Sequence, residues 1–292
     1  MKDDGRFQKS MRLLKRPPLE KLFTYTLLIF IALTMVYPMT WLLGSSLKQN
    51  DEIVTSLSII PRSFDFDSYI RGWKGNGRYT YTTFFMNTIK LVFPTVLATV
   101  VSSFVVSYGF ARFRFPFKKL FFLIVISTLI LPQQVIMIPR YILFNRLGWL
   151  DSYKPFIIPN ALATNSFFIY MLIQFIRGIP RELDESAYID GCSSFRILTS
   201  IILPLSKPAL FSVIIFQFIW RWNDFFDPLI YINSVKKFPV SLALRSNLDI
   251  SDTIAWNEVM AMSVLTMIPP IIVYILAQRY LVEGISTTGL KG

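Results

Sequence analysis

Long apolar runs separated by short polar stretches make up most of the chain. Each run contains few or no charged side chains, and together they cover residues 22–44, 91–110, 120–138, 156–176, 207–232 and 259–278. A helix needs roughly 20 apolar residues to cross a bilayer, and it satisfies its own backbone hydrogen bonds in lipid. The pattern therefore predicts an all-α integral membrane protein with six transmembrane helices.

The amino-acid composition supports this class. Hydrophobic residues make up 53% and charged residues 16% of the chain, whereas a soluble domain has about 25% charged residues. The first run follows a basic tail, residues 1–21, but it is longer than the roughly 7–15 apolar residues of a signal peptide, and we expect an uncleaved span. Residues 22–292 are expected to form one transmembrane domain, because the outer loop 48–83 is too short for another.

The net charge of +12 has two explanations. A basic surface can bind nucleic acid, but no basic stripe with interleaved aromatic residues stands outside the apolar runs, so we expect no nucleic-acid partner. Membrane proteins carry excess Lys and Arg on their cytoplasmic loops. This rule places the basic tail, the loop 112–119, the polar loop 180–206 and the C-terminus in the cytoplasm.

The residue types leave little scope for catalysis by this chain. It has no His and a single Cys, Cys192, which excludes Ser-His-Asp triads, His-bearing or thiolate metal sites and an internal disulfide. Glycines recur in residues 72–78 and 284–292, but the first pattern follows no strand and the second lacks the Gly-Lys-Ser/Thr of a phosphate loop. We expect no catalytic residue, no metal site and no cofactor bound by this chain.

Charge is concentrated in the segment "WRWNDFFDP", residues 220–228. If the fifth run is a helix that begins at Lys207, Asp224 lies roughly 25 Å along it, because each residue rises about 1.5 Å. This distance places the segment near the outer interface of the membrane. Intramembrane charge marks solute pathways, which makes Trp222, Asn223 and Asp224 candidates for a substrate path. An interfacial aromatic belt with snorkelling charge explains the same residues, and the sequence leaves both interpretations open.

The polar loop 180–206 carries the local signals of a helix. Pro180 suits a first helical turn, acidic side chains occupy that turn, where the helix dipole favours them, and Gly191 can end the helix in a left-handed cap. The sequence predicts a helix over residues 180–190, roughly 16 Å long.

A second helix is predicted directly after it. Ser193 or Ser194 can cap this helix at its start, Phe195, and Pro204 and Pro208 bend or break it as it enters the fifth run. The two helices would form a rigid elbow at the membrane face. A rigid elbow suits the docking of a partner better than it suits a plain connection between spans.

The spacing in this loop resembles the cytoplasmic signature of the membrane subunits of bacterial ABC importers. That signature is Glu-Ala-Ala, three residues, Gly, nine residues and Ile-x-Leu-Pro. The matching residues here are Glu185, Ser186, Ala187, Gly191, Ile201, Ile202, Leu203 and Pro204. Ser186 alone departs from the pattern, and it is also small. Residues 87–115, 222–232 and 278–292 resemble the carbohydrate-uptake branch of the family, so the resemblance covers nearly all of the chain.

The resemblance implies a multi-subunit importer in the bacterial cytoplasmic (inner) membrane. This chain would pair with a second homologous permease, two ATPase subunits would dock from the cytoplasm, and a solute-binding protein would deliver a sugar or oligosaccharide from outside. ATP and Mg²⁺ would bind the ATPase subunits rather than this chain, which would be a non-catalytic subunit.

The resemblance also assigns roles to the loop. Its first helix would be the coupling helix, in which small residues permit close approach to an ATPase and Glu185 pairs with a basic residue there. The C-terminal stretch would reach the same interface. The residues expected to serve ATPase coupling are Glu185, Ser186, Ala187, Asp190, Gly191, Ile201, Leu203 and Pro204.

Two other classes of membrane protein predict features that can be looked for in the sequence. A stand-alone carrier or channel predicts ionisable residues at mid-membrane or paired inverted halves, and the sequence offers neither. A membrane-embedded enzyme predicts a cluster of acids, bases or metal ligands. The lack of His weighs against an enzyme, while a carboxylate site stays open.

Overall fold

The computed structural model describes residues 18–75, 78–249 and 255–289. These ranges contain helices and connecting turns but no strand, in agreement with the all-α prediction. Most of the predicted basic tail, residues 1–17, lies outside the described part, and so do the last three residues and portions of both glycine patterns.

The described chain divides into two compact units. The first unit holds the described residues up to Arg71 together with Ala255–Val264, and the second holds the rest. The first apolar run forms α2 (Pro18–Ser45), and none of its apolar window is buried within the chain. A helix with so little internal packing has the surface expected of a lipid-facing span.

Polar contacts organise the rest of the first unit, which includes α3 (Asn50–Thr55) and the start of α4 (Asp67–Lys74). Arg71 donates through Nη2 to Asp65 Oδ2 at 2.7 Å and through Nε to Glu258 Oε1 at 3.2 Å. Asn257 Nδ2 donates to the same Asp65 oxygen at 3.1 Å. These contacts tie the loop after α3 to the start of the last helix, α16 (Trp256–Gly289).

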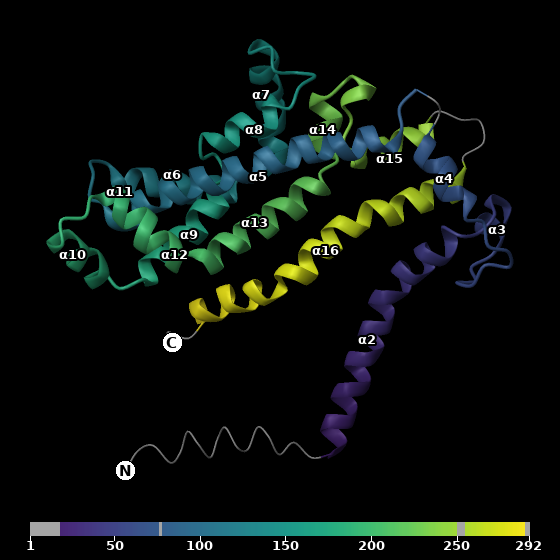
Figure 1. Ribbon diagram of the computed structural model, residues 1–292, viewed down its shortest axis with the longest axis horizontal. Helices are drawn as coiled ribbons and strands as arrows, with labels where there is room; N and C mark the ends of the chain where they lie inside the picture. Colours follow the sequence, from purple (N-terminus) through teal and green to yellow (C-terminus); the bar gives the residue numbers. More distant parts are fainter. Residues whose placement is uncertain (1–17, 76–77, 250–254, 290–292) are drawn as a thin grey trace. The chain divides into compact units, whose positions relative to one another are not determined.

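In the second unit the long helix α5 makes contact with more helices than any other element of that unit's described part. Figure 1 shows α5 running alongside α9 and α13. Helix α5 spans Tyr81–Arg112. It packs against α8 (Lys154–Ala161), α9 (Ser166–Gly178), α13 (Lys207–Trp222) and α15 (Val240–Asp249). The second apolar run therefore forms the middle of this bundle.

Buried polar side chains join three of these helices. Thr99 of α5 donates to Asn160 Oδ1 of α8 at 3.0 Å, and Gln217 of α13 donates to the Thr99 hydroxyl at 3.1 Å. Ser102 donates to the Asn160 carbonyl at 2.6 Å. Interhelical hydrogen bonds of this kind connect membrane helices where the apolar surface alone gives little specificity.

The third apolar run does not form the continuous helix that was predicted from its length. It divides into α6 (Lys118–Ile130) and α7 (Gln133–Arg146), which meet at 107°. Leu131 is extended because it precedes Pro132, and the residue before a proline disfavours helix. At roughly 20 Å, α6 is shorter than the bilayer core of about 30 Å, so α6 alone is too short to cross the membrane.

The fourth and fifth runs are also interrupted. A turn containing Ala163, at φ 56°, separates α8 from α9 within the candidate span Lys154–Gly178. The fifth helix ends at Trp222, and a short α14 (Phe226–Tyr231) follows, so the prediction of one helix over 207–232 is wrong. Asn223 caps the C-terminus of this helix, and its backbone amide donates to the Ile219 carbonyl at 3.1 Å.

The described residues contain four helical segments long and apolar enough to cross a membrane, one of them the interrupted Lys154–Gly178, and up to six spans if each of two bent pairs counts as one. The bent pairs are Lys118–Ile130 with Gln133–Arg146, and Ser194–Leu205 with Lys207–Trp222. The upper number matches the six predicted spans, although three of the predicted runs contain breaks.

Candidate functional site

The predicted elbow is present, and its first helix, α10, spans Glu182–Ile189. Gly191 has φ +78° and ends this helix in the left-handed conformation. The Cys192 amide donates to the Ala187 carbonyl at 2.9 Å, and the Gly191 amide donates to the Tyr188 carbonyl at 3.0 Å. These two bonds form the Schellman arrangement. This arrangement requires a positive φ at residue 191, which glycine adopts without steric cost.

The second arm of the elbow begins one residue earlier than predicted, with α11 (Ser194–Ile197). The Ser193 hydroxyl caps it by accepting from the Arg196 amide at 3.3 Å. A π-helical turn (Leu198–Ile202) and the short α12 (Leu203–Leu205) follow. The arm then turns by 75° into α13, which confirms the bend expected from the prolines.

The signature residues of α10 divide between its two faces. Ala187 is buried and packs in the core of the second unit, while Glu185, Ser186 and Asp190 are exposed. Asp184 is buried as well, because it lies three residues before Ala187 and shares its face of the helix. In the second arm, Ile201 packs partly buried against the same core, and Leu203 and Pro204 are exposed.

A buried ion pair fastens α10 to the end of α5. Arg112 Nε lies 2.6 Å from Asp184 Oδ2, and these side chains are 6% and 11% exposed. Arg112 also donates through Nη2 to the Ile179 carbonyl at 2.9 Å, and Arg181 donates to the Ala111 carbonyl at 3.3 Å. Burial raises the pKa of the Asp184 carboxyl above its ordinary value, and Arg112 and Arg181 offset this effect only in part.

This pair was not predicted. From the sequence, Arg112 is one of the basic residues of a predicted cytoplasmic loop, and Asp184 is one of the acidic residues that the helix dipole favours in the first turn. The spacing of Asp184 and Ala187 on one helical face was the available signal. The identity of the partner was not available, because it is far away in the chain.

Further contacts brace the second arm on α5. The Tyr108 hydroxyl donates to the Ser194 carbonyl at 3.2 Å, and the Tyr188 and Ser194 hydroxyls lie 2.9 Å apart. Ile197 and Ile202 are fully buried in the core that contains Tyr108. Both arms are therefore fixed to the same helix, α5.

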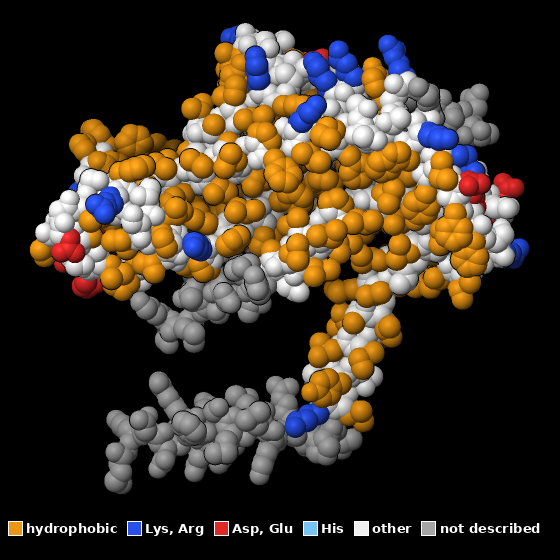
Figure 2. Space-filling view, in the orientation of Figure 1, with side chains coloured by type: hydrophobic (Ala, Val, Ile, Leu, Met, Phe, Trp, Pro, Cys, Tyr) orange, Lys and Arg blue, Asp and Glu red, His pale blue; other side chains and the backbone are white. Residues whose placement is uncertain are grey.

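The opposite side of the elbow is open. Ile189 is 87% exposed and Phe195 is 73% exposed, with Tyr188 and Leu183 about half exposed beside them. Figure 2 shows acidic side chains over the part of the structure where α10 lies in Figure 1. Apolar and acidic side chains of the elbow are thus left uncovered by the residues that the structure describes.

The three substrate-path candidates occupy different environments. Trp222 is 3% exposed, and its indole Nε1 donates to the Thr266 carbonyl at 3.1 Å. Asp224 accepts from Arg221 Nη1 at 2.6 Å, and Arg221 also reaches Asp227 at 3.1 Å. Asn223 is exposed at the end of α13. The local charges are paired with one another, and of these three side chains only the amide of Asn223 is exposed.

No group of three His, Cys, Asp or Glu side chains in the described ranges could hold a metal ion. Cys192, in the turn after α10, is a free thiol that packs partly buried against the core.

Comparison with known proteins connects this geometry to a family. Residues 103–287 match the model of the family described as binding-protein-dependent transport system inner membrane component. The arabinooligosaccharides transport system permease protein of Bacillus subtilis is 32% identical, over 91% of this chain and 94% of its own length. The sn-glycerol-3-phosphate transport system permease protein of Agrobacterium fabrum is 28% identical, over 94% of this chain and 99% of its own length.

A solved structure supports the fold separately. One chain from the crystal structure of a bacterial ABC transporter involved in the import of the acidic polysaccharide alginate superposes with a TM-score of 0.81. The alignment covers 91% of this chain and 99% of that chain at 24% identity.

Proposed function

Because the chain belongs to the family of binding-protein-dependent transport system inner membrane components, we propose that it is one permease subunit of an ATP-driven sugar importer. It forms the transport path with a second, homologous permease. A solute-binding protein delivers a sugar or oligosaccharide from outside, and two ATPase subunits bind ATP and Mg²⁺ on the cytoplasmic side. The N- and C-termini and the elbow lie in the cytoplasm.

The uncovered surface of the elbow carries this proposal. Ile189 is 87% exposed and Phe195 is 73% exposed, and exposed apolar side chains of this kind favour a protein partner. The inner face of α10 is fixed to α5 through Arg112 and Asp184. Closure of the ATPases moves α10, and the rigid arm carries the movement into α13. Two global arrangements, biased by ATP, then expose the path to alternate sides.

Sugar is the proposed cargo, since two of the compared proteins are named for an oligosaccharide and a polysaccharide. Asn223 is the contact that we propose from this chain, through its exposed amide. Trp222 and Asp224 support the outer end of α13 from inside, because their polar atoms are already used.

ATPase docking can be tested by co-purification. In a co-expressed complex, Ile189→Asp should reduce the ATPase recovered with this chain by roughly 30-fold, the effect expected of an interface hot spot. Leu57→Asp is the matched control, because Leu57 is 83% exposed but lies in the loop after α3. Equal recovery with both variants would place the docking surface elsewhere.

The transport assignment is tested in proteoliposomes. The complete complex with its binding protein should hydrolyse ATP faster when the correct sugar is present, and a panel of sugars identifies the cargo. Sugar uptake by this chain alone, without ATP, would instead indicate a stand-alone carrier.

A further inference from the structure

A pocket lies between the loop that joins α5 to α6 and the end of α9. Its volume is about 560 Å³, and it is lined by Arg114, Phe115, Phe117, Lys118, Lys119, Phe122 and Arg177. This volume falls within the range of small-molecule sites, about 300–1,000 Å³. Neither the proposed transport path nor the exposed side of the elbow uses these residues.

The pocket carries positive charge without an acidic counterpart. Four of its lining side chains are Arg or Lys and none is Asp or Glu. None of the ion pairs found in the described ranges involves these four cations. Lys118 Nζ donates to the Phe113 carbonyl at 2.7 Å, which holds this ammonium group at the pocket. Several uncompensated cations around one cavity favour an anionic ligand.

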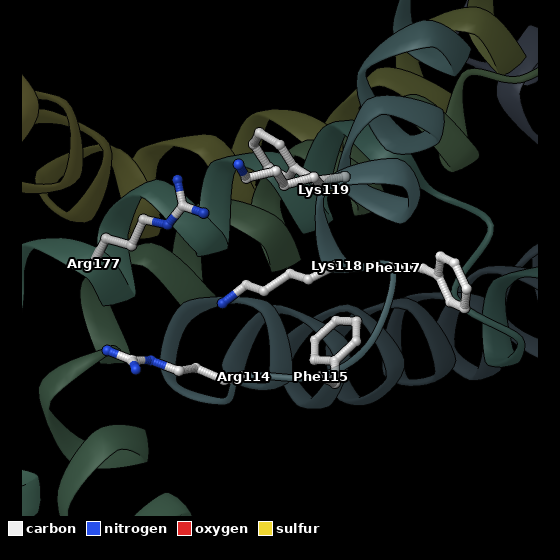
Figure 3. A pocket seen from close by; sticks show the side chains of 7 residues that line it. Arg114, Phe115, Phe117, Lys118, Lys119 and Arg177 are labelled. Atoms are coloured by element: carbon white, nitrogen blue, oxygen red, sulfur yellow. The ribbon is translucent and has the colours of Figure 1, made fainter.

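Aromatic rings position two of the cations. The Arg177 guanidinium lies 5.1 Å from the centroid of the Phe122 ring, and Lys118 Nζ lies 5.8 Å from that of Phe115. Figure 3 shows the charged ends of Arg177 and Lys118 on the same side of the pocket, while Phe117 points away from them. A cation held on a ring face keeps its N–H groups free for phosphate oxygens.

An apolar strip continues from the pocket along α6. No residue of α6 is buried, and Leu120, Phe121 and Ile124 are each about half exposed. In a membrane-spanning chain this strip faces hydrocarbon, and the cations stand where the strip begins. Free phosphate would use the cations only, whereas a phospholipid would use both the cations and the strip.

We propose that this pocket binds the phosphate headgroup of an anionic phospholipid, with the acyl chains lying along α6. Basic pockets at the ends of membrane helices recognise lipid headgroups in this manner. The site is at the same end of the bundle as α10, since Arg112 contacts the Ile179 carbonyl just beyond Arg177. A bound headgroup would brace the end of α9, from which the elbow departs.

Lipid retention by the purified complex tests the proposal directly. Native mass spectrometry should show phosphatidylglycerol retained on the wild-type complex in preference to phosphatidylcholine. The triple variant Arg114→Gln, Lys119→Gln, Arg177→Gln should retain at least about tenfold less phosphatidylglycerol, because each Lys or Arg near an anionic headgroup contributes to binding. Lys118 is left unchanged because it bonds to the backbone.

The matched control removes the same number of charges elsewhere. Arg146, Lys154 and Lys236 are exposed and outside the pocket, so Arg146→Gln, Lys154→Gln, Lys236→Gln should retain phosphatidylglycerol as the wild type does. Equal losses in the two variants, or equal retention of the two lipids, would overturn the site.

Competition with inorganic phosphate distinguishes a site for free phosphate from a site for a phospholipid headgroup. Inorganic phosphate at about 10 mM, a concentration that would largely fill any phosphate site with a Kd of about 1 mM, should leave phosphatidylglycerol in place. Full displacement would show a soluble-anion site and overturn the lipid assignment. The measurement needs no transported sugar, so it is independent of the proposed cargo.

Discussion

Arg112 Nε lies 2.6 Å from Asp184 Oδ2, and this buried pair joins the last residue of α5 to the inner, buried face of α10. Two elements that are distant in the sequence are thereby held as one. The pair explains how an elbow made of short helices can be rigid, because neither arm is long enough to be stable by itself.

Removing one member of this pair leaves the other charge buried without a partner. Asp184→Ala should lower the free energy of unfolding by roughly 3–5 kcal/mol and should reduce ATP-driven uptake by the assembled complex. Thermal unfolding in detergent and proteoliposome transport measure the two effects. Glu182→Ala, at an exposed acid of the same helix, is the control and should change neither. An unchanged Asp184→Ala protein would show that the pair does not hold the elbow.

The left-handed conformation of Gly191 predicts that different substitutions at this position destabilise the protein to different degrees. A Cβ at this position would meet nothing within 4 Å, but the φ of +78° strains any other residue. Gly191→Ala should therefore cost roughly 1–2 kcal/mol, and Gly191→Pro should cost more, because proline fixes φ near −65°. Uptake should fall in the same order. Gly178→Ala, where a Cβ also meets nothing and φ is not positive, should behave as wild type.

The exposed carboxylate of Glu185 should matter for coupling and not for folding. Glu185→Lys is expected to change the free energy of unfolding by less than about 0.5 kcal/mol, as surface substitutions do, while sugar-stimulated ATP hydrolysis falls. Normal coupled uptake in an assembled Glu185→Lys complex would remove the role that we propose for this residue. Ser186→Ala, which restores the family signature, should retain full uptake.

Asp151 predicts a dependence of stability on pH. Burial raises its pKa, but hydrogen bonds from Lys237 and Ser234 and from the amides of Ser234 and Asn233 outweigh burial and hold the pKa well below its ordinary value. An acid with a depressed pKa stabilises the folded state above its unfolded pKa, and this contribution is lost as pH falls toward the folded value.

The stabilising effect of Asp151 should therefore be largest at neutral pH. Thermal unfolding at pH 7 should show Asp151→Asn less stable than wild type, and the difference should shrink as the pH falls below about 4. A difference that stays constant over this range would mean that the charge of Asp151 contributes nothing.

The proposed topology can be tested with single cysteines in a Cys192→Ala background. Asp190 and Arg146 are both exposed. An impermeant thiol reagent should label Arg146→Cys in intact cells and label Asp190→Cys only after permeabilisation. Labelling of Asp190→Cys in intact cells would place the elbow outside.

Short-range signals made the elbow predictable. Gly191, Ser193 and Pro204 act on their immediate neighbours, so the helix boundaries and the bend came within two residues of the structure. The break at Pro132 had a local signal too, but counting apolar length overlooked it. The length of an apolar segment indicates whether it can cross the bilayer, but it does not show that a proline, which lacks a backbone N–H, interrupts the helix.

The sequence by itself determined the class of protein, the positions of the apolar runs and the form of the elbow, because these depend on composition and on neighbouring residues. Only the tertiary structure decided which side chains of the elbow face inward and which are left for a partner. Arg112 of α5 forms an ion pair with Asp184 of α10, and the cations of the α5–α6 loop line one pocket together with Arg177 of α9. Such pairings form between residues far apart in the chain, where burial and helix packing, rather than local preference, fix the geometry.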